Sequence, residues 1–259
     1  MDWSKAKSIL IVTFLILNLF LGAQLVQTMQ QTSNLMETDN INREQVDQMM
    51  RENRITLSKD QNTSFPTSLV AYQANITPMG PEWKKDERGG YTREFPDAPV
   101  VRDFRDLEKF LKGTVPWFSE YKLSLSRGSR VVYNQLVEGR YIFDATLEVQ
   151  LKSGNRVQSV RVVHYESVKL QPVELMTLDT ALYHLLTNWS LKKGSVITSV
   201  DLGYRAKARG TGDESILVPY YRFRVENLNQ DLFLNARTFK EVEAEPRDQE
   251  TEEKGTRQP

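Results

Sequence analysis

Histidine and cysteine, which serve as metal ligands and in nucleophilic catalysis, are scarce in this chain of 259 residues. His164 and His184 are its only histidines, and no cysteine is present. The missing thiols exclude disulfides, thiolate metal sites and cysteine nucleophiles. No further ligand stands at a suitable spacing near either histidine, so a zinc site is not expected. The chain also carries no Gly-x-Ser-x-Gly, His-Glu-x-x-His, phosphate-loop or Gly-x-Gly-x-x-Gly motif. We therefore expect no catalytic residue, no metal and no cofactor.

Carboxylates are abundant, and any two of them make a possible catalytic pair, so a two-carboxylate hydrolase stays open as an alternative. Asp144 and Glu148 alternate with apolar residues in a predicted strand, which places both on its polar face. We interpret neither as catalytic, and we expect alanine at either position to leave function intact in a folded protein. The 34 acidic and 34 basic side chains cancel, so the charge balance does not indicate a nucleic-acid partner.

Three aromatic side chains, Trp83, Trp117 and Tyr220, are candidates for a recognition surface, which would make the chain a binding module. Packing is the competing interpretation. Tyr221 and Phe223 alternate as a core face, and Trp117 is expected to plug the sheet.

One long apolar segment, residues 9–26, contains no charged side chain. About 18 residues of helix span roughly 27 Å, close to the ~30 Å hydrocarbon core of a bilayer. We predict a transmembrane helix, because a signal peptide has a shorter apolar region followed by a small-x-small site, and a buried core helix is shorter. Lys5 and Lys7 precede the segment, and the next basic residue is Arg43. The positive-inside rule therefore predicts a single-pass protein of the cell membrane, with a cytoplasmic N-terminus and an extracytoplasmic remainder.

A polar amide, Asn18, stands near the middle of this apolar segment, where it is unfavourable without a hydrogen-bond partner. Gly22, four residues further on, lets another backbone approach closely. We predict that one face of the helix binds the membrane helices of a partner. At helical spacing, this face consists of Ile11, Phe14, Leu15, Asn18, Gly22 and Leu25.

The remaining chain reads as alternating helices and strands. A helix is predicted over residues 42–54 with Asn42 as N-cap, and another over residues 103–112 with Gly113 as its stop. Strict alternation predicts a strand over 141–151, which a turn connects to a partner strand over 156–168.

A similar order follows. Thr177 is the predicted N-cap of an amphipathic helix that Gly194 ends. Strands are predicted over the ranges 196–208, 216–226, 231–236 and 239–242. A helix followed by a hairpin thus occurs twice, which favours an α+β fold: one N-terminal transmembrane helix, then two similar units of helix plus antiparallel sheet.

These patterns divide the chain into six segments. They are a cytoplasmic N-terminus (1–8), the transmembrane helix (9–29), a linker (30–41), a first extracytoplasmic α+β domain (42–168), a second one (169–242) and a charged, disordered tail (243–259).

Four short stretches are distinctive: residues 1–9 (MDWSKAKSI), 202–204 (LGY), 218–223 (VPYYRF) and 234–238 (LNART). In these stretches the chain resembles the YycI (WalI) family of membrane-anchored accessory proteins from low-GC Gram-positive bacteria. The likeness extends from the first residue to about residue 242.

The resemblance implies a regulator and brings no catalytic residue or cofactor. Members of this family associate with the sensor histidine kinase YycG (WalK) and with the companion protein YycH, in the two-component system that controls cell-wall metabolism. Their extracellular part has two similar α+β domains, in agreement with the repeat described above. The alternatives are an extracytoplasmic binding module for a cell-wall fragment and a wall-active carboxylate hydrolase.

Overall fold

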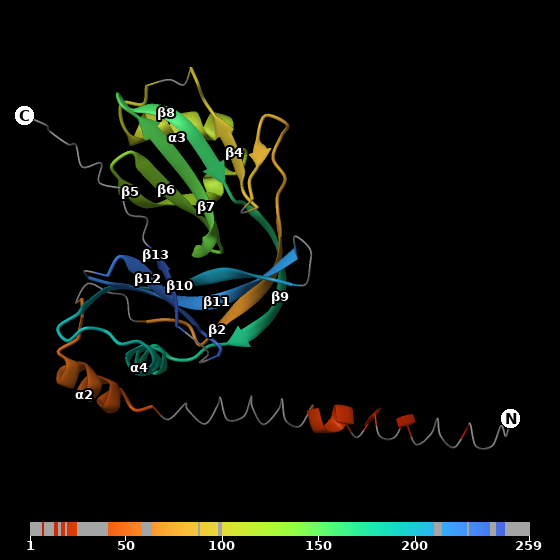
Figure 1. Ribbon diagram of the computed structural model, residues 1–259, viewed down its shortest axis with the longest axis vertical. Helices are drawn as coiled ribbons and strands as arrows, with labels where there is room; N and C mark the ends of the chain where they lie inside the picture. Colours follow the sequence, from red (N-terminus) through yellow and green to blue (C-terminus); the bar gives the residue numbers. More distant parts are fainter. Residues whose placement is uncertain are drawn as a thin grey trace, which may run out of the picture.

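The computed structural model describes residues 7, 13–14, 17–18, 20–24, 41–58, 64–87, 89–97, 100–209, 214–226, 228–238 and 242–246. The fold is mixed α+β and consists mostly of sheet (Figure 1). Its helices are α2 (Arg43–Asn53), α3 (Phe104–Thr114), α4 (Leu178–Asn188) and the short 3-10 helix η2 (Phe118–Glu120). Its strands are β1 (Thr56–Leu57), β2 (Ser68–Ile76), β3 (Lys84–Lys85), β4 (Tyr91–Glu94), β5 (Tyr121–Arg127), β6 (Arg130–Val137), β7 (Arg140–Lys152), β8 (Arg156–Val162), β9 (Tyr165–Glu174), β10 (Val196–Ala208), β11 (Glu214–Val225), β12 (Gln230–Asn235) and β13 (Val242–Pro246).

The strands form two groups, which we name lobe I (residues 84–162) and lobe II (residues 41–76 and 165–246). In lobe I the strand order is β5-β6-β7-β8-β4-β3, and α3 packs on one face of this sheet. In lobe II the order is β13-β12-β11-β10, with α2 and α4 below it in Figure 1. Each lobe contains a helix followed by a four-stranded antiparallel meander, β5 to β8 after α3 and β10 to β13 after α4.

The elements nearest the N-terminus belong to lobe II. Strand β1 pairs in parallel with the beginning of β10, and β2 lies between β11 and β9. Helix α2 contributes Val46 to the core that Leu182 and Leu185 of α4 also enter. The predicted domain 42–168 therefore contains elements of both lobes.

Local side chains begin the three long helices. The Asn42 carboxamide oxygen accepts a hydrogen bond from the Glu44 backbone N–H, Asp103 caps α3 in the same way, and the Thr177 hydroxyl oxygen accepts from the Thr180 N–H. These contacts satisfy N–H groups that the first helical turn leaves without partners. The predicted N-caps Asn42 and Thr177 are confirmed.

The predicted C-terminal stops are wrong. Helix α3 continues through Gly113 to Thr114, and α4 ends at Asn188, well before Gly194. The backbone turns to an extended conformation at Trp189, whose side chain packs against the lobe II core. Gly194 instead takes a left-handed conformation, with φ of 83°, in the turn that leads to β10.

Two predicted boundaries also change. The predicted strand 156–168 is two strands, because the chain leaves lobe I after β8 and enters lobe II with β9. Residues 243–246, assigned to a disordered tail, form most of β13, which pairs with β12. Residues 247–259 lie outside the described residues.

Part of the predicted transmembrane segment can be seen. Residues 13–14, 17–18 and 20–24 are helical, and their side chains are exposed. Within the ranges that the structure describes, no helix combines the length and the apolar character needed to cross a membrane. The other residues of the segment lie outside those ranges.

Candidate functional site at the junction of the lobes

Strands β7 and β10 bring the two lobes into contact. Ile142 of β7 pairs in parallel with Tyr204 of β10, and both are buried in a small apolar core between the lobes. A Cβ atom added to Gly203 would lie 2.5 Å from the Tyr141 carbonyl oxygen and 2.7 Å from the Phe143 ring. Such distances are shorter than van der Waals contact, so only glycine permits this approach of the two strands.

A buried cation lies beside this close approach. Arg222 of β11 is 5% exposed and donates from Nη2 to the Asp201 carboxylate of β10 at 2.8 Å. Its guanidinium also lies 4.5 Å from the centre of the Phe143 ring, which comes from lobe I. Burial lowers the pKa of the Arg222 guanidinium, because removal from water disfavours the charged form. Among the described residues, Asp201 is the carboxylate in contact with this charge, and Asp231 adds a more distant favourable interaction.

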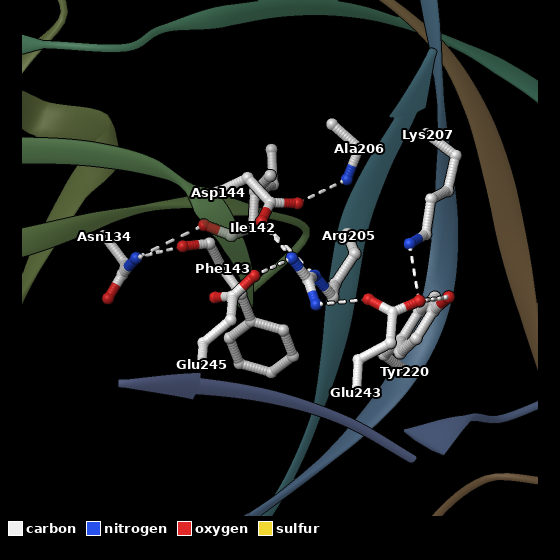
Figure 2. A network of polar contacts seen from close by, with 10 residues as sticks. All are labelled: Asn134, Ile142, Phe143, Asp144, Arg205, Ala206, Lys207, Tyr220, Glu243 and Glu245. Carbon is white, nitrogen blue, oxygen red and sulfur yellow. Dashed lines mark hydrogen bonds and ion pairs between the residues drawn. The ribbon is translucent and has the colours of Figure 1, made fainter. Parts of the chain in front are cut away.

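A second buried cation, Arg205 of β10, is the centre of a larger network (Figure 2). Its guanidinium contacts Asp144 of lobe I at 3.1 Å, Glu243 of β13 at 2.7 Å, and Glu245 of β13. The other Asp144 oxygen accepts the Ala206 backbone N–H at 2.6 Å. Although burial opposes the charge, the three carboxylates together raise the pKa of Arg205. The network therefore joins β7, β10 and β13 through one positive charge.

Aromatic rings line the network. Arg205 lies 4.6 Å from the centre of the Phe233 ring, and Phe233 lies 5.3 Å from Phe143. The Tyr220 hydroxyl donates to Glu243 at 3.2 Å, and Lys207 donates to the same carboxylate oxygen at 2.7 Å. Two arginines stacked on two neighbouring rings thus hold the lobes together by charge, hydrogen bonds and cation–π contacts.

A third polar cluster surrounds the point where the chain passes between the lobes. His164 is 5% exposed, with Nδ1 2.7 Å from the Thr77 hydroxyl and Nε2 2.9 Å from the Glu120 carboxylate. The Trp117 ring stacks on the imidazole, with centroids 4.3 Å apart. Gln135 donates to both Glu120 and the Tyr165 carbonyl. These residues line an open hollow of about 540 Å³. Burial lowers the pKa of His164, although Glu120 opposes this effect.

We expect stability to fall as the pH is lowered from 7.5 to 5.5. Burial lowers the pKa of both His164 and His184, whereas an unfolded chain titrates them near pH ~6.5. The unfolded state then binds more protons, so each histidine contributes stability above that pH that is lost as the pH falls through its folded pKa. The slope is at most about 1.4 kcal/mol per pH unit for each proton. The raised pKa of Glu245 acts in the opposite direction.

Denaturant unfolding at both pH values measures this effect in the wild type, in His164→Gln, in His184→Gln and in the double variant. The double variant should lose less stability than the wild type between the two pH values. Equal losses would contradict the assignment to histidine. Glu245 is common to all four proteins and cancels in the comparison.

The two carboxylates on the polar face of β7, Asp144 and Glu148, are both paired. Asp144 binds Arg205, and Glu148 binds Arg130 at 2.6 Å and Arg161 at 3.6 Å. Four residues of strand separate the two acids by about 13 Å, more than the roughly 5–9.5 Å that glycosidases use. An Asp144→Ala variant therefore tests the lobe junction rather than catalysis. Among the described residues, no group of three or more potential ligand side chains is placed to hold a metal ion.

The candidate recognition aromatics are mostly buried. Trp83 lies in the lobe I core at 6% exposure, and Tyr220 lies in the junction at 3%. Trp117 is half-buried against His164 rather than inserted in the core of a sheet. The hypothesis of an exposed aromatic surface thus loses two of its three members.

The predicted membrane-helix face is only partly described. Phe14, Asn18 and Gly22 are helical and exposed, whereas Ile11, Leu15 and Leu25 lie outside the described residues. The junction residues were not predicted as a site. Arg205 and Arg222 alternate with apolar residues, a pattern that shows which side chains share a face but not that a second lobe covers that face.

Comparison with known proteins gives one family. The family model described as YycI protein matches residues 30–237. No curated protein matches the chain. Among solved structures, an uncharacterized protein from Eubacterium rectale has 7% identity and a TM-score of 0.39, covering 73% of this chain and 90% of that one. The YpeB C-terminal domain of Bacillus megaterium has 14% identity and a TM-score of 0.30, covering 78% and 96%.

Proposed function

Because this chain belongs to the YycI family, a family of regulatory accessory proteins of the YycG/WalK two-component system, we propose that it modulates the sensor histidine kinase without being an enzyme. It does so together with a YycH-like partner, through contacts in the membrane and outside it. The observation that carries this proposal is the family match over residues 30–237, a range that holds most of both lobes.

The proposal includes the membrane location. Residues 9–26 carry no charge, and Lys5 and Lys7 stand before them, which supports one membrane-spanning helix with a cytoplasmic N-terminus. The lobes then lie outside the membrane. Helix α2 begins at Arg43, so a segment of less than twenty residues connects the apolar segment to lobe II.

The arrangement of the two lobes suits a protein that acts by binding other proteins rather than by catalysis. The junction of the lobes combines a small apolar core with paired charges and stacked rings, and Arg205 and Arg222 lie at its centre. A partner that binds either lobe therefore acts on a body whose two halves are fixed to each other. This supports a regulatory scaffold whose orientation relative to the membrane conveys the signal.

The partner face of the membrane helix provides the test. Replacing Asn18 by Leu and Gly22 by Ile should lower the amount of kinase that co-purifies with the full chain by at least about threefold. An interhelical hydrogen bond in membranes averages about 0.6 kcal/mol, a factor of about three, and a bulkier side chain at Gly22 adds separation of the helices. The measurement is quantitative pull-down from detergent-solubilised membranes, together with the output of the kinase.

Ile16→Leu, on the opposite side of the helix, is the matched control and should change neither quantity. If the double variant stays fully associated while the extracytoplasmic part also binds, recognition lies outside the membrane. If the wild-type chain recovers no histidine kinase at all, the proposed function itself fails.

A further inference from the structure

Strand β13 covers what would otherwise be an open sheet edge. Residues Val242–Pro246 pair antiparallel with residues 230–234 of β12, and β12 has its other neighbour in β11. The side chains of β13 alternate. Val242 and Ala244 pack against the lobe II core, whereas Glu243 and Glu245 reach the cations of the lobe junction. Along residues 242–245, apolar or small side chains thus alternate with acidic ones.

The surface that receives these two acids is basic. Without β13, Arg205 would keep Asp144 as its carboxylate partner, and Lys207 would lose the carboxylate of Glu243. Both cations lie over the Tyr220 ring, at 5.7 Å for Arg205 and 5.3 Å for Lys207 (Figure 2). The Tyr220 hydroxyl adds a donor for a carboxylate. Two cations, one hydroxyl and the N–H groups of a strand edge are suited to bind an extended acidic segment.

The interactions that hold β13 are mainly polar. Its two core-facing side chains are small and only partly buried. The Glu243 and Glu245 side chains are 36% and 48% exposed, whereas that of Arg205 is 10% exposed. Arg205 is thus buried while β13 is in place and is also held by Asp144, whereas Lys207 is 42% exposed and the strand that covers both cations is short and partly solvated. Such a strand can leave while its site keeps its shape.

We propose that the β12 edge, with Arg205, Lys207 and Tyr220, is a binding groove for an acidic strand of a partner protein, and that β13 occupies it as an internal competitor. The partner segment is extended, adds to β12 as β13 does, and carries acidic side chains at alternate positions. The apolar positions between them are small, because Val242 and Ala244 set the available depth.

Charge gives this groove its selectivity. A neutral or basic strand would cover Lys207 without supplying a carboxylate and would leave Arg205 with Asp144 alone, so it is disfavoured relative to an acidic strand. The same contact links partner binding to the lobe junction, because Arg205 also binds Asp144 of lobe I. Exchange of β13 for a partner strand therefore changes the surroundings of Arg205, which contacts both lobes. The groove is a different surface from the membrane helix, and acidic strands can bind it whatever the identity of the kinase partner.

The experiment uses the purified full chain in detergent and a fluorescent peptide with the sequence of residues 242–250, VEAEPRDQE. The double variant Glu243→Gln/Glu245→Gln weakens the internal strand with little change of shape. It should bind the peptide at least about tenfold more tightly than the wild type does, because the competitor is weaker. A peptide with glutamine in place of Glu243 and Glu245, VQAQPRDQE, should bind at least about tenfold more weakly.

Two further variants locate the binding. Lys207→Met in the double-variant background should weaken peptide binding, because it removes one of the two cations. Glu214→Gln is the matched control: this glutamate pairs with the exposed Arg209 at 3.8 Å at the other end of β11, and peptide affinity should equal that of the wild type. Equal affinities for the acidic and the glutamine peptide would overturn the proposal.

If the double variant does not fold, hydrogen exchange of the wild-type chain tests the same proposal. In the wild type, saturating peptide should speed amide exchange in residues 242–246, which it displaces, and leave residues 230–234 protected. No change in residues 242–246 at saturating peptide would show that the internal strand does not exchange, and would overturn the proposal.

Discussion

Replacing Asp201 by alanine is expected to lower the free energy of unfolding by about 3–4 kcal/mol, because it removes the carboxylate that contacts the buried Arg222 guanidinium. Asp201 and Arg222 are directly opposite each other in β10 and β11, and the Arg222 side chain is 7% exposed. Phe143 and Tyr141 cover the guanidinium and keep water away. Ring faces attract a cation, but they stabilise it less than a carboxylate does.

Denaturant unfolding of the purified chain measures this loss. The double variant Asp201→Ala/Arg222→Met should be more stable than Asp201→Ala alone, because methionine removes the charge and keeps much of the volume. Glu214→Ala, which breaks an exposed pair, should cost no more than about 1 kcal/mol. A double variant that is no more stable than the single one would mean that Arg222 does not depend on Asp201.

The second large effect is expected at Gly203, where alanine should lower stability by about 2–3 kcal/mol. Its Cβ would lie 2.5 Å from the Tyr141 carbonyl oxygen, and backbone atoms cannot turn aside as a side chain can. Strands β7 and β10 must then separate, which breaks the pairing of Ile142 with Tyr204. Amide exchange in residues 140–145 and 201–206 should quicken together with the loss of stability.

Gly113 provides the opposite result from the same substitution. It lies inside α3, and an added Cβ meets nothing within 4 Å. Gly113→Ala should therefore stabilise the protein by up to about 1 kcal/mol, through better helix propensity. If both alanine variants shift stability in the same direction, steric contact at Gly203 is not the cause.

Local features of the fold could be predicted from the sequence. The N-caps Asn42 and Thr177 act on N–H groups two or three residues away, so nearby sequence contains the whole interaction. Strand β10 has the predicted bounds, and apolar residues recur at every second position from Val200 to Ala208. The turn at residues 153–155 follows from Gly154 and Asn155, which both have positive φ.

Features that depend on distant residues could not be predicted. The apolar pattern continues across residues 156–168, and only the folded lobes show that β8 and β9 belong to different sheets. In the sequence, Glu243 and Glu245 look like part of a charged tail, and only the structure shows that they pair with Arg205. Period-two patterning identifies a polar face, but pairing partners determine whether that face is wet or buried.

The order of the lobes along the chain sets the order in which they can form. Ile76 at the end of β2 pairs with Tyr165 at the start of β9, so lobe I is a nested insertion between two adjacent strands of lobe II. During synthesis, lobe I is complete before β9, β10 and β11 leave the ribosome, and β2 must wait for them. Folding of lobe I draws its two ends together and shortens the effective loop that β2 and β9 must close. Folding of the inserted lobe I thus favours folding of lobe II, which surrounds it in the sequence.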